Sequence, residues 1–218
     1  VKDLQAHCGL EASGVVDAAT KGAILRPRAD VNAHPHGARD ERTYAPGQRI
    51  RVFVDTPPGH LGAEVPAAEC VAAEVGRACD AWAAAAGVSF ALVKQRGKAD
   101  ITVSWADRTP DNLFLFDGKG GSLAEAGKDH ITLDEAEYWV LQGAAPNPRR
   151  QLPFELLPIL LHEMGHCLGL VHSECADDVM FPYYVPGRVS LAPGDVRRVQ
   201  ALYAPGQKTV AGRLSVPL

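Results

Sequence analysis

The sequence predicts an α+β fold with about five strands and three helices, and two kinds of hydrophobic repeat carry that prediction. Apolar residues recur at three- and four-residue steps over residues 64–86, which is the period of a long amphipathic helix. Shorter stretches such as ADITVSWA alternate apolar and polar residues, which is the period of a strand. At 218 residues with 46% hydrophobic and 22% charged residues, the chain suits one soluble domain with a short appendage.

The first thirty residues form a small segment that is distinct from the rest of the chain. They predict a short helix, a glycine-containing turn and a second helix that begins near Asp17, a suitable N-cap. Alone, this piece is too small to hold a core, so it must dock on something or fray. Residues 27–48 are rich in Pro, Gly, His and charge, which predicts an exposed linker of the kind that proteases cut.

The remaining elements follow in order along the chain. Gly87 ends the long helix as a C′ glycine would. The next helix can begin only around Phe154 to Leu157, because Pro158 is tolerated only in a first turn. A last helix runs from about Pro193 to Tyr203. The expected strands lie near residues 49–55, 88–93, 99–106, 122–126 and 130–133, and a polar loop follows the last of them.

Charge and cysteine usage exclude several classes of function. A net charge of -4 gives no reason to expect nucleic acid or an acidic membrane as a partner. No apolar run approaches the roughly 20 residues that span a bilayer. The five cysteines cannot all pair within one chain, and without a CxxC pair they do not predict a thiolate zinc site. We expect all five to be unpaired; a disulfide between Cys167 and Cys175 is the alternative.

One stretch, HEMGHCLGLVH, points directly to chemistry. On a helix, His162 and His166 leave the same face one turn apart, with Glu163 beside any metal they share. Gly169 permits a sharp turn, which brings His172 back as a third nitrogen ligand. Three nitrogens leave the fourth position of Zn²⁺ open, which is typical of a catalytic site rather than a structural one.

Further residues make a family resemblance specific. Met180 lies eight residues past His172, and Ser173 follows that histidine directly. The chain resembles the matrixins, the matrix-metalloproteinase family of metzincin zinc endopeptidases, whose Met-turn underlies the three histidines. Pro182 and Tyr184 match the wall of the family's S1′ pocket, which receives the side chain after the scissile bond.

The resemblance extends to other parts of the site. Pro158 lies at a position that helps to line the same pocket in the family. SLAPGDVRRVQALY resembles the family's closing helix, in which Asp195 is expected as a buried hydrogen-bonding residue under the Met-turn. Gly194 stands where the family has the first of two aspartates. FDGKGGSLAEAG matches the family's FDGxGGxLAHA pattern, so an extended substrate is expected to lie along Leu123 and Ala124.

What the resemblance implies is a secreted zinc endopeptidase with a twisted mixed sheet, acting as a monomer on protein or peptide substrates. Zn²⁺ would lower the pKa of a water to about 7 and polarise the peptide carbonyl. Glu163 would take the proton and pass it to the leaving amine. Two rivals remain: another metzincin with an unknown peptide preference, and a zinc-holding binding module without turnover, against which Glu163 argues.

The family's other metal sites fare differently. Pro110, Asn112, Glu125 and Thr132 stand where the family's structural zinc is held, and none keeps the family residue, so we predict that this zinc is absent. A calcium site is expected from matching carboxylates and nearby loop carbonyls, because Ca²⁺ requires oxygen ligands. Its carboxylates are Asp117, Asp134 and Glu137, and its carbonyl donors come from Gly118, Lys119, Gly120 and Ser122.

The N-terminal segment resembles the tail of a matrixin propeptide but lacks its switch cysteine. PRADVNA replaces the family's PRCGxPD, and Ala29 occupies the cysteine position. Asp30 could reach the zinc as a carboxylate instead, with His34 or His36 as substitutes; alternatively, the segment holds no metal. The chain then divides into four parts: a propeptide tail (1–30), a linker or switch segment (31–48), a catalytic domain (49–205) and a C-terminal extension (206–218).

Overall fold

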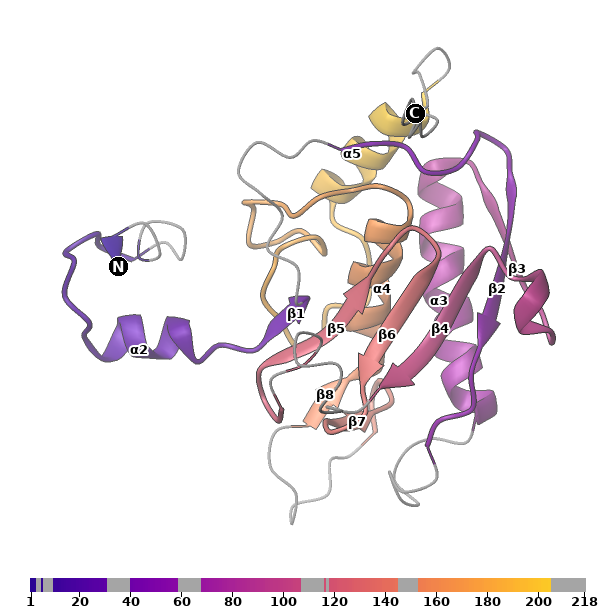
Figure 1. Ribbon diagram of the computed structural model, residues 1–218. Helices are drawn as coiled ribbons and strands as arrows, with labels where there is room; N and C mark the ends of the chain where they lie inside the picture. The colour runs from indigo at the N-terminus through magenta and orange to yellow at the C-terminus, as the bar shows by residue number, and fades with distance from the viewer. Residues whose placement is uncertain are drawn as a thin grey trace, which may run out of the picture.

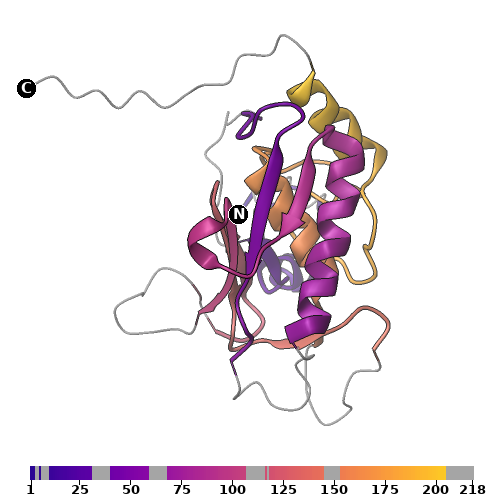
Figure 2. The ribbon, with the colours of Figure 1, turned by 90° about the vertical axis from the view of Figure 1, so that its right-hand side faces the viewer.

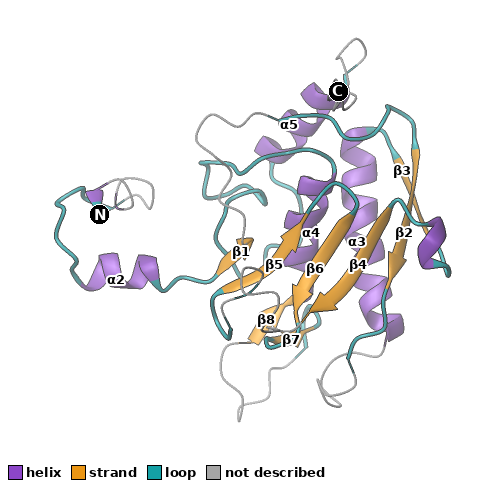
Figure 3. Ribbon diagram, viewed as in Figure 1, coloured by secondary structure: helices purple, strands orange, loops and turns teal. Residues whose placement is uncertain are grey.

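One mixed sheet with three helices on one of its sides forms the body of the protein (Figures 1 and 2). The computed structural model describes residues 1–2, 5, 10–30, 40–58, 68–106, 116, 118–144 and 153–204. The N-terminal helix α2 (Ala18–Ile24) projects beyond the edge of the sheet (Figure 3). Asp17 caps it by accepting a hydrogen bond from the Thr20 amide at 2.7 Å. The predicted α+β class is confirmed.

The sheet contains the five predicted strands and a sixth that the sequence did not predict. In spatial order its strands are β1 (Arg28–Asp30), β5 (Ser122–Ala126), β6 (His130–Asp134), β4 (Ile101–Ala106), β2 (Arg49–Val54) and β3 (Ser89–Leu92). Only β5 and β6 pair antiparallel; the other neighbours are parallel. The additional strand, β1, comes from a segment that its composition marked as a linker, and it occupies the sheet edge beside β5 (Figure 1).

A second, two-stranded parallel sheet corrects another expectation. Its strands are β7 (Tyr138–Val140) and β8 (Pro153–Glu155), and β7 lies where the sequence predicted a polar loop. All three residues of β7 are buried, and the indole of Trp139 donates to the Asp134 carbonyl at 2.7 Å. Three residues are too few to display a periodic pattern, so the sequence gives little sign of this strand. A 3-10 turn, η2 (Arg96–Lys98), precedes β4.

The helices lie close to their predicted bounds. The long helix α3 is described over Ala68–Ala86 and ends at Gly87, whose φ is +66°. The active-site helix α4 (Leu156–Cys167) has Pro158 in its first turn, and all twelve of its residues are buried. The last helix, α5 (Pro193–Tyr203), begins at its proline. None of the helices in the described part of the chain is both long and apolar enough to cross a membrane.

Close contacts fix α4 against α3. The indole N–H of Trp82 on α3 donates to the Leu161 carbonyl at 2.8 Å. A Cβ at Gly165 would lie 2.9 Å from the Trp82 ring and 2.3 Å from the Met180 sulfur. The absence of a side chain at Gly165 therefore lets α4 pack directly against the Trp82 ring and the Met180 sulfur.

The four cysteines in the described residues are free thiols, in line with the expectation that the cysteines are unpaired. Cys167 is buried, Cys175 is exposed, and neither forms a disulfide, so the alternative of a bond between them was wrong. Burial raises the pKa of the Cys79 thiol on α3 to about 12. Cys8 lies outside the described residues.

Candidate active site

Three histidines converge where α4 ends. The Nδ1 atom of His162 lies 2.8 Å from the Val179 carbonyl, and that of His166 lies 2.8 Å from the Leu170 carbonyl. A carbonyl oxygen can only accept, so each Nδ1 carries the proton and each neutral ring turns the lone pair of Nε2 to the centre. Backbone partners of this kind fix the tautomer and orientation of metal-binding histidines.

The arrangement of the donors suits a zinc ion. One ligand atom from each of Asp30, His162, His166 and His172 lies within 4.8 Å of the others. The Nε2 atoms of His162 and His166 are only 3.0 Å apart, and two lone pairs at that distance repel each other unless a cation lies between them. Burial, with His162 adding to it, lowers the pKa of His166 well below its usual value. The ring therefore stays neutral, the state in which imidazole binds metal.

Glu163 is completely buried on the same helix. Neither of its carboxylate oxygens has a hydrogen-bond partner among the described residues. Burial raises the pKa of this carboxyl well above its ordinary value, and the negative charge of Asp30 raises it further. A carboxyl with raised proton affinity, held beside a metal site, is suited to accept a proton and then release it.

The segment below the histidines is held by a carboxylate on α5. Asp195 is buried and accepts hydrogen bonds from the amides of Val179 at 2.8 Å and Met180 at 3.2 Å. The Val179 carbonyl in turn receives the Nδ1–H of His162. Met180 is also fully buried, with its sulfur against α4 at Gly165. One carboxylate thus links α5 to the orientation of a ring on α4.

Gly169 makes the turn that returns the chain to His172. Its φ is +100°, and a Cβ there would lie 1.7 Å from the Glu41 carbonyl oxygen. The Glu41 amide donates to the Gly169 carbonyl at 2.8 Å, so the two backbones lie in direct contact. Glycine is required here both by the backbone conformation and by the space available.

Substitution of Gly169 should therefore be far more costly than substitution of an unconfined glycine. We expect Gly169→Ala to lower the free energy of unfolding by about 3 kcal/mol or more, the sum of left-handed strain and overpacking. Gly143, with a φ of +76° and no atom within 4 Å of a built Cβ, is the matched control. Gly143→Ala should cost only about 1–2 kcal/mol. Equal losses for both variants in urea unfolding would contradict this reasoning.

A strand of the chain's own N-terminal segment lies against the histidines. We call residues 27–30 the blocking strand. Its Arg28 and Asp30 pair in parallel register with Ser122 and Ala124 of β5. On its other side, the Ala29 amide donates to the Pro182 carbonyl at 3.0 Å. The blocking strand is thus hydrogen-bonded along both edges, and it occupies the position beside β5 that the sequence assigned to a substrate.

The same strand brings Asp30 to the histidines. Its Oδ2 atom lies 3.3 Å from Nε2 of His166 and 3.5 Å from Nε2 of His172, and the side chain is 1% exposed. Arg26, just before the blocking strand, packs its guanidinium over the rings of Tyr183 and Phe181, 5.1 and 5.6 Å from their centroids. His34 and His36, the other ligand candidates, lie outside the described residues.

A small pocket lies beside His162. Of the three residues that the resemblance assigns to the S1′ pocket, Pro158 and Tyr184 line this pocket and Pro182 does not. Ala29 of the blocking strand contributes to its wall. Tyr184 is held by its hydroxyl, which accepts from the Glu155 amide at 3.0 Å. Sequence reasoning missed Arg188, which also lines the cavity and donates to the Asp178 carbonyl at 2.6 Å. The remaining lining residues are Ile159, Val179, Phe181, Tyr183 and Val185.

Comparison with known proteins agrees with this geometry. A family model described as Matrixin, among the M10 peptidases, matches residues 63–204. The chain belongs to the matrixin family. Matrix metalloproteinase-20 of Homo sapiens is 31% identical, over 100% of this chain and 44% of its own length. Interstitial collagenase of Equus caballus is 30% identical over 96% of this chain and 44% of its own.

This membership confirms the predictions of a matrixin and of a metalloendopeptidase domain. Stromelysin-1 of Equus caballus, 27% identical over 94% of this chain, is matched over 42% of its own length. The chain thus spans less than half the length of the relatives it matches.

Two of the carboxylates expected to bind calcium are buried. Asp134 accepts from the Ala136 amide at 2.8 Å, and Glu137 accepts from the Gly120 amide at 2.5 Å. The third, Asp117, lies outside the described residues. The Glu137 carboxylate is therefore positioned at the 118–120 turn.

An ion pair occupies part of the region that corresponds to the family's structural zinc. Glu125 and Thr132 lie opposite each other on β5 and β6. The ring of His130 lies 3.6 Å from a Glu125 oxygen and 2.9 Å from an Asp129 oxygen. These carboxylates, Glu125 first, raise the pKa of His130 to about 9. Pro110 and Asn112 lie outside the described residues.

The raised pKa of His130 predicts a pH-dependent contribution to stability. A folded pKa of about 9 lies above the ordinary 6.5, so the contribution is fully present below pH 6.5 and is lost as the pH rises through 9. His130→Gln should lower the melting temperature at pH 6 but not at pH 10. Because the side chain is 43% exposed, the effect should stay below about 1 kcal/mol. Asp100→Asn, which breaks the Arg51 pair, should cost the same at both pH values.

Proposed function

We propose that the chain is a zinc-dependent endopeptidase that cleaves extended polypeptides. The observation that carries this proposal is the convergence of the His162, His166 and His172 side chains beside the buried Glu163 carboxyl. His162, His166 and His172 would hold the ion, which would supply Lewis-acid activation of water and of the peptide carbonyl. A secreted enzyme is the expectation for this family, and we adopt it here.

The chain's own residues would then transfer the proton and orient the metal-binding imidazoles. Glu163 accepts the proton of the attacking water and passes it to the amine that leaves. Its burial keeps bulk water from competing for that proton. The Val179 and Leu170 carbonyls hold the two helical imidazoles in one tautomer throughout, so that no reorganisation is needed during turnover.

The substrate would take the place of the blocking strand. An extended peptide could pair with β5 at Leu123 and Ala124 on one side and with residues 182–184 on the other. Its side chain after the scissile bond would enter the cavity lined by Pro158 and Tyr184. Affinity would come from backbone hydrogen bonds, and specificity from this one cavity.

In the chain as given, residues 1–30 would act as the tail of a propeptide and keep the enzyme latent. The blocking strand fills the substrate position, and Asp30 aims a carboxylate at the histidines in place of the family's cysteine. Cleavage within the 31–48 segment would release it. Among the alternatives that the sequence left open, Asp30 is supported by the position of its Oδ2 atom. That atom lies 3.3 Å from Nε2 of His166 and 3.5 Å from Nε2 of His172.

Metal analysis combined with peptide cleavage tests the zinc proposal. We expect one zinc per chain, with calcium as a second metal at Asp117, Asp134 and Glu137, and cleavage that a zinc chelator abolishes. His172→Ala should lose zinc affinity and activity together. Zinc binding without cleavage, after residues 1–30 have been removed by a protease, would favour a binding module. An absence of bound zinc would refute the proposal.

A further inference from the structure

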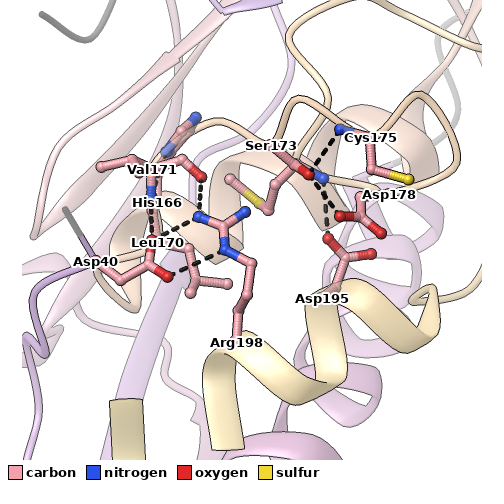
Figure 4. A network of polar contacts seen from close by, with 10 residues as sticks. Asp40, His166, Leu170, Val171, Ser173, Cys175, Asp178, Asp195 and Arg198 are labelled. Carbon is pink, nitrogen blue, oxygen red and sulfur yellow. Dashed lines mark hydrogen bonds and ion pairs between the residues drawn. The ribbon is translucent and has the colours of Figure 1, made fainter. Parts of the chain in front are cut away.

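Asp40, within the 31–48 segment, is hydrogen-bonded to the loop that carries the third histidine. We call residues 168–172 the histidine loop. The Val171 amide donates to Oδ1 of Asp40 at 3.0 Å, and Nη2 of Arg198 on α5 donates to the Val171 carbonyl at 2.7 Å (Figure 4). Both polar groups of one backbone residue are therefore held by side chains that lie far away in the sequence.

These two side chains also bind each other. Nη2 of Arg198 lies 2.5 Å from Oδ1 of Asp40, and Nε lies 3.0 Å from Oδ2. The pair is only 24% exposed on either side. Planar, two-point pairing of this kind is stronger and more directional than a single contact. Asp40 and Arg198 thus form one rigid unit, which we call the clamp.

The position of the clamped residue gives this contact its meaning. Val171 lies between Leu170, whose carbonyl receives the Nδ1–H of His166, and His172. Fixing the Val171 backbone therefore fixes the acceptor that orients one imidazole and the Cα that carries another. The glycine turn before it has no side chain with which to hold the loop, so the restraint must come from outside.

We propose that Asp40 and Arg198 are positioning residues for the metal centre, which set the zinc affinity by holding His166 and His172. This inference rests on the proposed zinc site and deepens it. It predicts a role for Asp40 that is separate from latency, although only ten residues separate it from Asp30. The clamp holds the histidine loop of the proposed zinc site, whereas the blocking strand covers that site and would inhibit it.

The experiment measures the zinc dissociation constant of the full chain by competition with a chromophoric chelator. Asp40→Ala and Arg198→Ala should each weaken zinc binding about 10- to 100-fold, the usual effect of losing a partner that orients a ligand. The double variant should be no weaker than the worse single one, because the pair acts as a unit. Asp40→Asn, which keeps an acceptor for the Val171 amide, should recover part of the loss.

Two controls separate this role from a merely structural one. Asp100→Ala removes a similar two-point pair with Arg51, 2.7 and 2.9 Å long, that touches none of the histidines. It should lower the melting temperature of the metal-free protein without changing zinc affinity by more than about twofold. Cobalt substituted for zinc should give a shifted visible absorption spectrum in Asp40→Ala and an unchanged one in Asp100→Ala.

The outcomes are distinguishable. If the parent chain binds no zinc, the proposed function fails. If the parent binds zinc and the clamp variants match Asp100→Ala, the clamp proposal alone is overturned. Repeating Asp40→Ala together with Asp30→Ala decides the remaining case. A loss of affinity that persists supports positioning of the histidines, whereas a loss that disappears means that Asp40 acts only through the blocking strand.

Discussion

Replacing Glu163 with glutamine should reduce peptide hydrolysis by about 10²–10⁴-fold while zinc stays bound, which is the contribution expected of a general base. Glutamine matches the shape of the carboxylate but cannot accept the proton of an attacking water. The three histidines keep their own partners, so metal content should be unchanged. Stability should not fall, because the buried carboxyl that is removed has no hydrogen-bond partner among the described residues.

The rates are best compared in Asp30→Ala chains, so that latency does not mask the effect. Glu74→Gln is the matched control, since Glu74 is also a buried glutamate on a helix but pairs with Arg77 instead of facing the metal site. It should leave the rate nearly unchanged. A Glu163→Gln enzyme that works within tenfold of its parent would show that another group accepts the proton.

The clustering of the histidines could be predicted from the sequence because its geometry is local. His162, Glu163 and His166 lie on one helix, and helical spacing alone places them side by side. The turn at Gly169 is equally local, and its φ of +100° is the conformation that the motif requires. Amphipathic periods located the long helix and the five main strands for the same reason, since each pattern is complete within one segment.

What the sequence could not predict depends on contacts between distant segments. Strand β1 has no periodic signal over its three residues, and its pairing with β5 joins segments that lie far apart in the sequence. The pair of Asp40 and Arg198 joins residues 158 positions apart, with nothing in either local sequence to indicate it. Arg188 reaches the pocket from a turn that no motif marks. A family resemblance can locate such segments, but it does not predict which of their residues contact one another.

In the chain as given, Asp30→Ala should raise the rate of hydrolysis of a quenched peptide about 10- to 100-fold, because one charge-assisted contact of about 1.5–3 kcal/mol holds the blocking strand at the proposed metal site. Asp30→Asn tests the charge separately, since it keeps the size of the side chain. It should approach the alanine variant if the carboxylate itself matters, and the parent if strand pairing alone blocks the cleft.

Other residues of the N-terminal segment supply the controls. Asp17→Ala removes the cap of α2, far along the chain from the cleft, and should leave the basal rate near that of the parent. Arg26→Ala removes the packing on Tyr183 and Phe181 and should release the strand in part, giving an intermediate rate. If Asp30→Ala were no faster than Asp17→Ala, while proteolytic removal of the segment still activated the enzyme, the blocking strand would inhibit by occupancy alone. The carboxylate near His166 and His172 would then have no part in latency.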